Sequence, residues 1–131
     1  MDTIANMFTQ LKNAGHAGKK EVSVSYSKLN LAILAILKEK GFVASFKEET
    51  AEGKKYPNLT VTLSFKANNE LSFNDIRRVS RSGRRIYVGA GRLPQLMRGK
   101  AEILVSTSKG VMSGTDAKKK GLGGEILGEV V

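Results

Sequence analysis

The apolar residues in the first half of this chain change from a helical to a strand period and back again. Four of them recur at intervals of three and four, as on one face of an α-helix: Ile4, Met7, Phe8 and Leu11. Val22 and Val24 then alternate with serines, which is the period of a strand with one buried face. Since a helix or a sheet must bury its apolar face against another element, this order predicts helices packed on a β-sheet.

Capping residues and glycines set the predicted ends of two helices. The side chain of Asp2 or Thr3 can accept a hydrogen bond from the first amides of a helix that ends within residues 15–18. Ser27 is placed to cap a second helix, which Gly41 closes. The predicted apolar face of this second helix includes Leu31, Leu34, Ala35 and Ile36.

Strand patterns complete a first domain. Segments 42–47 and 59–65 have the composition of strands and are joined by the polar loop 48–58. Together with the two helices and the strand at 22–25, they predict an α-β-α-β-β block over residues 1–67.

Residues 68–131 are predicted to form a second, mostly β domain with a short helix. Strands 71–80 and 84–88 flank the turn Arg81-Ser82-Gly83, in which glycine permits a positive φ. The remaining elements, in order, are strand 101–107, one helical turn capped by Thr115 or Asp116, and strand 126–131. The predicted fold class is therefore α+β, with two small domains packed together.

All seven arginines of the chain lie between Arg77 and Arg98. From Asp75 to Lys100 the sequence has eight basic residues and one acid, so this window holds +7 of the formal net charge of +10. Arginine has a planar guanidinium that bridges phosphate oxygens and stays charged at physiological pH. Its concentration in one window predicts an anionic partner, with nucleic acid as the first candidate.

The sequence argues against several other classes of protein. The chain has no cysteine, which excludes disulfides and thiolate metal sites and favours a reducing compartment. The N-terminus lacks the charged lead and apolar core of a signal peptide, and the apolar stretch 29–37 is interrupted by Asn30 and too short to span a bilayer. His16 has no second ligand nearby, and no phosphate-binding P-loop is present. We therefore expect a soluble cytoplasmic protein with no metal, no cofactor and no membrane partner.

The segment 106–110, Ser-Thr-Ser-Lys-Gly, places three hydroxyls, a cation and a flexible glycine at the end of a predicted strand. Hydroxyl groups donate and accept hydrogen bonds, so they suit phosphates, ribose 2′-hydroxyls and base edges. In a regular strand Ser106 and Ser108 share one face, and Thr107 joins them only if the chain bends near Gly110. The competing interpretation is an exposed strand end with ordinary turn chemistry.

Three other motifs also have two interpretations each. Ser106 and Lys109 match the Ser-x-x-Lys pattern of serine acyltransferases, but that chemistry needs both residues on one face of a helix, so no catalytic site is predicted. The glycine-rich run 121–125 either brings a backbone close to another segment or forms a tight turn. Tyr87, within the arginine window, either stacks on a base or is a half-buried strand residue.

Three motifs in this order resemble one family. They are Ser80-Arg81-Ser82-Gly83-Arg84-Arg85-Ile86-Tyr87, Ser106-Thr107-Ser108-Lys109-Gly110-Val111-Met112, and Gly123-Gly124-Glu125-Ile126-Leu127. The opening Asp2-Thr3-Ile4-Ala5-Asn6-Met7, with Lys12-Asn13-Ala14 and Ser27-Lys28-Leu29, is similar to the opening of the same family. From end to end, the chain resembles the family of ribosomal protein eight of the small subunit.

The resemblance implies two small packed domains and a structural constituent of the small ribosomal subunit, not an enzyme. Such a protein binds the central domain of the small-subunit ribosomal RNA, helps to assemble the platform, contacts neighbouring ribosomal proteins and is a monomer when free. Many bacterial members also repress their own operon by binding a messenger site that resembles the ribosomal one. The RNA-binding residues expected at matching positions and in the arginine window are Ser106, Thr107, Ser108, Lys109, Gly110, Tyr87, Arg84, Arg85, Gly123, Gly124, Glu125, Thr3 and Asn6.

The chain departs from the family pattern in three places. Gln10 and Lys12 stand where the family usually has arginines, so weaker RNA binding by the first helix is expected. Ser82 replaces a usual proline in the turn at Gly83. Before the hydroxyl run, the segment 99–103 reads Gly-Lys-Ala-Glu-Ile in place of Gly-x-Gly-Ile.

A basic architectural nucleic-acid-binding protein outside the ribosome is the main alternative function. It would require a groove-reading helix or a paired basic ribbon, and the predicted helices contain no arginine. Binding to an anionic membrane surface is disfavoured because neither helix couples a large apolar face to a basic one.

Overall fold

The computed structural model describes residues 2–50, 53, 57–93 and 101–131. Its helices and antiparallel sheets confirm the predicted α+β class. The chain divides into two compact units, Met1–Asn74 and Asp75–Val131, which we call unit 1 and unit 2.

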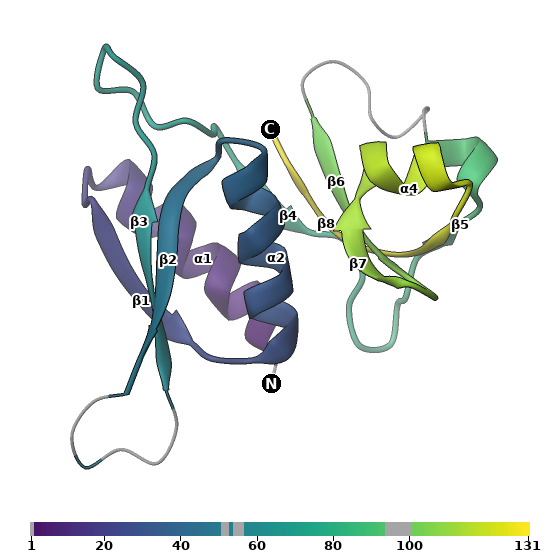
Figure 1. The fold of residues 1–131 in the computed structure, drawn as a ribbon, viewed down its shortest axis with the longest axis horizontal. Helices are drawn as coiled ribbons and strands as arrows, with labels where there is room; N and C mark the ends of the chain where they lie inside the picture. The colour runs from purple at the N-terminus through teal and green to yellow at the C-terminus, as the bar shows by residue number, and fades with distance from the viewer. Residues whose placement is uncertain (1, 51–52, 54–56, 94–100) are drawn as a thin grey trace. The chain divides into compact units, whose positions relative to one another are not determined.

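Unit 1 is a three-stranded antiparallel sheet with helices α1 (Thr3–His16) and α2 (Lys28–Glu39) on one of its faces (Figure 1). The strands lie in the order β1-β3-β2, and they are β1 (Glu21–Ser25), β2 (Val43–Glu49) and β3 (Asn58–Leu63). The α-β-α-β-β order predicted from the sequence is therefore present.

The predicted helix caps of unit 1 are made by Asp2 and Ser27. The carboxylate of Asp2 accepts hydrogen bonds from the amides of Ile4 and Ala5, each at 3.1 Å. The hydroxyl oxygen of Ser27 accepts one from the amide of Asn30 at 3.0 Å. These contacts satisfy amides that have no partner within their own helix, so each helix begins where its cap residue stands.

The predicted apolar face of α2 was wrong at one position. Ala35 is exposed, whereas Ile33 and Leu37 join Leu34 and Ile36 in the core of unit 1. Because apolar residues occur on several sides of α2, the sequence alone does not define its buried face, which is the face that packs against the sheet.

The last residues of unit 1 turn back onto its sheet. Leu71 forms an antiparallel bridge with Phe65, and the amide of Ser72 donates to the carbonyl of Ser64 at 3.0 Å. The compact units consequently divide at Asn74, whereas the sequence placed the domain boundary at 67/68.

The open face of the unit 1 sheet is polar. It carries exposed serines such as Ser23 and Ser45, and the Nζ atom of Lys47 lies 2.8 Å from the Oε1 atom of Glu49. This hydrogen bond raises the pKa of Lys47 and lowers the pKa of Glu49. Gln10, at one of the departures from the family pattern, donates from Nε2 to the carbonyl of Ser23 at 3.3 Å and so connects α1 to β1.

Unit 2 is an antiparallel sheet in the order β4-β8-β6-β7, with β5 also paired to β8. Helix α4 (Gly114–Lys120) and the 3-10 turn η1 (Ala90–Arg92) cover one face (Figure 1). The strands are β4 (Ile76–Arg78), β5 (Tyr87–Val88), β6 (Glu102–Thr107), β7 (Gly110–Ser113) and β8 (Gly124–Val130).

The core of unit 2 lies between this sheet face and α4. It consists of Leu93, Ile103, Val105, Met112, Ala117 and Ile126, with Val79, Ile86, Val88 and Leu122 packed at its border.

Two predicted strands of unit 2 are much shorter than expected. Only residues 76–78 of the segment 71–80 form a strand. The segment has two different partners, because Leu71 bridges to Phe65 within unit 1 whereas residues 76–78 pair with β8 in unit 2. Of the segment 84–88, only Tyr87 and Val88 form a strand, because Arg84 instead bridges back to Arg81.

The cap of α4 was also predicted wrongly. Ser113, not Thr115 or Asp116, caps the helix, and its hydroxyl oxygen accepts from the amide of Asp116 at 3.2 Å. The carboxylate of Glu102 holds the amide and hydroxyl of Thr115 instead.

Candidate nucleic-acid interface

Four residues from four strands of unit 2 form one row across the sheet. Tyr87 pairs with Glu125, Glu125 with Ser106, and Ser106 with Val111. Directly paired residues of an antiparallel sheet project on the same face. Their neighbours Val105, Met112 and Ile126 lie in the core under α4, so the row lies on the opposite face of the sheet.

We call this row, together with Arg85, the Ser106 face. Arg85 belongs to it because it is two residues from Tyr87 and reaches the same Glu125. Tyr87 is 67% exposed, which excludes the half-buried alternative and leaves its ring available for stacking. Val111 was not predicted, since only the register of β6 and β7 brings it to Ser106.

The carboxylate of Glu125 is paired within the protein. Its Oε2 atom lies 3.0 Å from the Nη1 atom of Arg85, and its side chain is 14% exposed whereas that of Arg85 is 54% exposed. The guanidinium offsets a negative charge that would otherwise repel phosphate. The carboxylate of Glu125 thus accepts a hydrogen bond from Arg85 within the protein.

The three hydroxyls of the turn between β6 and β7 are not equivalent. Thr107 donates from Oγ1 to the carbonyl of Gly110 at 2.8 Å and accepts from the amide of Lys109 at 3.1 Å. Its hydroxyl therefore closes the turn, which Gly110 permits with a φ of +110°. Within the described part of the chain, the hydroxyls of Ser106 and Ser108 have no hydrogen-bond partner and are available to a ligand.

Gly123 and Gly124 are required by close backbone contacts and not by an unusual φ. A Cβ atom on Gly124 would lie 2.0 Å from the carbonyl oxygen of Ser106, and one on Gly123 would lie 2.3 Å from that of Val88. Of the two interpretations of the run 121–125, the close approach holds for these two residues. Gly121, with a φ of +66°, makes the turn after α4.

The arginines divide into those bound within the protein and those without a described partner. Arg77 pairs with Glu129 and lies 3.7 Å from Asp75, while Arg78 donates to the carbonyl of Leu127 at 2.5 Å. Among the described residues, the guanidinium groups of Arg81, Arg84 and Arg92 have no hydrogen bond or ion pair. Arg98 and Lys100, and with them part of the segment 99–103, lie outside the described residues.

The predicted RNA-binding residues are therefore only partly brought together. Arg84 lies on the other side of the sheet, because it alternates with Arg85 and lines a hollow together with Ile86, which packs at the border of the core. Thr3 and Asn6 belong to α1 in unit 1, where Asn6 is exposed.

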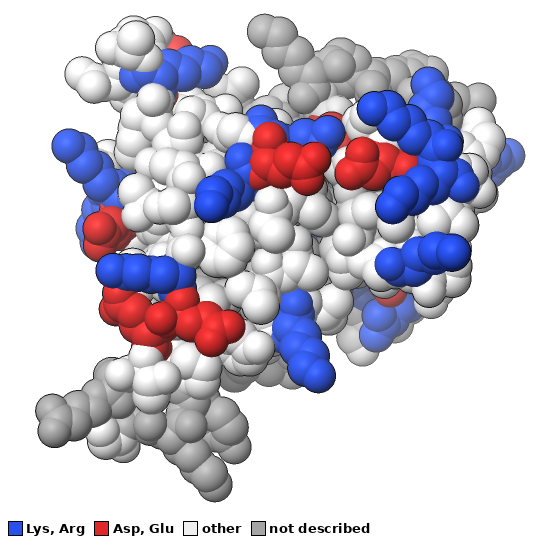
Figure 2. Space-filling model, in the orientation of Figure 1, with Lys and Arg blue, Asp and Glu red and all other residues white. Residues whose placement is uncertain are grey.

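Charge is unevenly divided between the units. Residues 75–131 contain 12 basic and 5 acidic residues, against 10 and 7 in residues 1–74. Figure 2 shows blue side chains gathered over the right-hand part of the view, which holds unit 2, whereas red side chains lie both beside them and in a group at the lower left, over unit 1. Unit 2 is thus the more cationic of the two.

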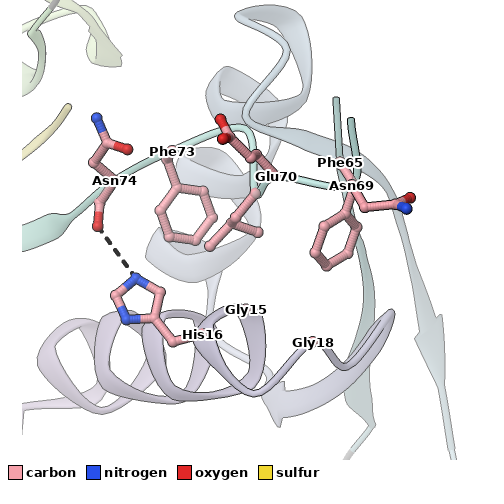
Figure 3. A pocket seen from close by; sticks show the side chains of 9 residues that line it. Gly15, His16, Gly18, Phe65, Asn69, Glu70, Phe73 and Asn74 are labelled. Atoms are coloured by element: carbon pink, nitrogen blue, oxygen red, sulfur yellow. Dashed lines mark hydrogen bonds between the residues drawn. The ribbon is translucent and has the colours of Figure 1, made fainter. Parts of the chain in front are cut away.

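A separate hollow of about 560 Å³ lies in unit 1, at the end of α1 (Figure 3). His16 points from the helix to Asn74, whose carbonyl oxygen is 3.2 Å from its Nε2 atom. The hollow is also lined by Phe65, Phe73 and Glu70.

The described residues hold no group of three or more His, Cys, Asp or Glu side chains suited to a metal ion, and none of their helices is long and apolar enough to cross a membrane.

A basic α+β protein that gathers hydroxyls, an exposed tyrosine and arginines on one sheet belongs by its chemistry to the nucleic-acid-associated proteins. The sequence model of the family described as ribosomal protein S8 matches residues 2–131. The chain therefore belongs to the ribosomal protein S8 family. It is a cytoplasmic structural protein of the small ribosomal subunit and not an enzyme, as the sequence predicted.

Individual relatives agree with this assignment. The small ribosomal subunit protein uS8 of Pseudarthrobacter chlorophenolicus is 44% identical over 130 residues, which cover 98% of this chain and 96% of the relative. The uS8 proteins of Pseudoalteromonas atlantica and Acholeplasma laidlawii are 45% and 36% identical over 129 residues, with 98% of this chain and 96% of each relative covered.

Proposed function

We propose that this chain is a primary RNA-binding protein that uses the Ser106 face and the adjoining turn to bind the central domain of small-subunit ribosomal RNA, and so helps to assemble the platform. One observation carries the proposal. The strand register places Ser106, whose hydroxyl has no partner among the described residues, in one row with the exposed Tyr87, and the free hydroxyl of Ser108 follows two residues later in the turn.

This surface has the chemistry that structured RNA requires. A-form RNA conceals its bases in a deep groove and displays ribose 2′-hydroxyls, which are both donors and acceptors. Serine hydroxyls match that dual character, and an unpaired base from an internal loop can stack on the tyrosine. The free protein acts as a monomer, and an operon messenger with the same internal loop would compete for the same face.

Replacement of both free hydroxyls should weaken specific binding. We expect Ser106→Ala with Ser108→Ala to cost about 1–3 kcal/mol, roughly 5–150-fold in Kd, for a central-domain RNA fragment. Binding to a regular duplex of equal length should change little. The measurement is a filter-binding or fluorescence titration of both RNAs across a salt series.

The matched control is Ser23→Ala with Ser45→Ala, which removes two exposed strand hydroxyls from unit 1. This control should bind both RNAs as the wild type does. If the hydroxyl variant kept its full preference for the central-domain fragment, the assignment of the Ser106 face would be incorrect.

Neutralising Glu125 should raise the general affinity for RNA while lowering the preference for the central-domain fragment. In Glu125→Gln the ion pair between this side chain and Arg85 is lost, so the guanidinium can turn more readily toward a phosphate. We expect tighter binding to the regular duplex at low salt and a salt slope steeper by about one unit, with a smaller preference for the central-domain fragment. An unchanged slope would show that Arg85 gains no phosphate contact on release from Glu125.

A further inference from the structure

A second cationic site lies on the other side of the unit 2 sheet from the Ser106 face. It is a hollow of about 300 Å³ beside the turn at Gly83, and its lining consists of Arg77, Arg78, Val79, Arg81, Arg84, Ile86 and Glu129. Val79 and Ile86 pack at the border of the core, which places the hollow on the face that α4 covers in part. We call it the arginine hollow.

Two arginines of this hollow are held directly opposite each other. Arg81 and Arg84 form an isolated antiparallel bridge in which each amide donates to the other carbonyl, at 3.1 and 2.9 Å. Gly83, with a φ of +84°, makes the tight turn between them. Like charges at directly paired positions destabilise a hairpin, and neither guanidinium has an acidic partner among the described residues.

The rest of the hollow supports a phosphate ligand. The negative charge of Glu129 is offset by its ion pair with Arg77, so it does not repel an anion strongly. Among the described residues, no aromatic side chain lines the hollow, which disfavours base stacking and leaves backbone phosphate as the group recognised. Paired guanidinium forks match phosphate oxygens in shape as well as in charge.

We propose that the arginine hollow binds the phosphate backbone of a second segment of the RNA that the Ser106 face recognises. This inference rests on the proposed function, since it takes the same RNA as the partner. The two sites would then contribute differently. The Ser106 face selects the RNA by its hydroxyl contacts, and the hollow adds affinity that depends on salt and not on sequence.

The test compares two RNAs with two charge variants. One RNA is a central-domain fragment, and the other is a stem trimmed to the internal loop that the Ser106 face recognises. The variants are Arg81→Gln with Arg84→Gln and, as a control of equal charge, Lys118→Gln with Lys119→Gln on the exposed side of α4. Each is titrated across a salt series.

We expect the arginine variant to bind the long fragment about tenfold more weakly at low salt, with a log–log salt slope shallower by about 1.5, as for the loss of two phosphate contacts. Its binding to the trimmed stem should match the wild type, and the lysine control should change neither RNA by more than about twofold. Because a like-charge contact is removed, the melting temperature of the free arginine variant should be no lower than that of the wild type.

Three outcomes would overturn the inference. Unchanged binding of both RNAs would show that the hollow does not contact RNA. Equal losses on the long and the trimmed RNA would place it within the primary site. If the arginine variant kept its RNA binding but lost binding to poly-glutamate, titrated in the same way, the hollow would be assigned to an acidic protein. Failure of the proposed function alone would appear differently, as a hydroxyl variant that keeps full specificity while the arginine variant still loses salt-dependent affinity.

Discussion

Gly124→Ala should destabilise unit 2 by about 3 kcal/mol, at the upper end of what overpacking usually costs. The added Cβ atom would lie 2.0 Å from the carbonyl oxygen and 2.9 Å from the carbonyl carbon of Ser106, so the strands β6 and β8 must separate. Both atoms belong to the backbone, which cannot rotate away as a side chain can. The free energy of unfolding, from urea titration followed by circular dichroism, measures the loss.

The same substitution should also weaken RNA binding, because Ser106 carries one of the free hydroxyls. Gly91→Ala is the matched control, since a Cβ atom there meets no atom of the described residues within 4 Å and its φ is not left-handed. We expect that variant to be neutral or to gain about 0.4–1 kcal/mol, because alanine restricts the unfolded chain. Wild-type stability in Gly124→Ala would contradict the close approach of β8 to Ser106.

The local elements of unit 1 were predictable because their signals lie close together in the sequence. Ser27 and the amide that it caps are three residues apart, so the start of α2 could be inferred from neighbouring residues. The end of unit 1 could not, because Leu71 pairs with Phe65 across a turn, and only this contact shows that segment 71–80 divides between two partners. An alternating pattern gives the period of a strand and not the identity of its partner.

The candidate site shows the same division. The hydroxyl run, Tyr87 and Glu125 were all predicted, but their common row depends on the register of three strands that are far apart in the sequence. Alternation along the chain predicts that Arg84 and Arg85 lie on opposite sides of the sheet. It does not predict which of the two arginines pairs with Glu125, because that depends on which face of the sheet the core occupies.

The two sheet faces of unit 2 thus carry different chemistry from one short segment of sequence. Residues 85–88 alternate between arginine or tyrosine and apolar residues, and Arg84 lines the arginine hollow together with Ile86, so the adjacent arginines Arg84 and Arg85 diverge. The arginines adjoin one another in the sequence but have different surroundings in the structure. Arg85 is bound to Glu125, whereas Arg81 and Arg84 line the arginine hollow. This arrangement allows one small sheet to contact two segments of a folded polyanion.

Asn30→Asp should be the second large perturbation, this time in unit 1. Asn30 is fully buried, its Nδ2 atom donates to the carbonyl of Ser25 at 3.0 Å, and its Oδ1 atom has no partner among the described residues. An ionised carboxylate of the same shape cannot donate to Ser25 and carries an unpaired charge into the core. We expect a loss of about 3–5 kcal/mol in the free energy of unfolding at pH 7.

The pH dependence gives that prediction its sharpest test. Burial raises the pKa of the introduced carboxyl in the folded state, whereas in the unfolded chain it stays near its ordinary value of about 3.9. The penalty is therefore complete above the raised folded pKa and shrinks as pH falls toward 3.9, where the protonated acid can donate to Ser25 again. Asn13→Asp, on the exposed side of α1, should cost less than about 1 kcal/mol at every pH. Equal losses at the two positions, or a loss at Asn30 that acid does not relieve, would mean that the buried amide is not what joins the end of β1 to the start of α2.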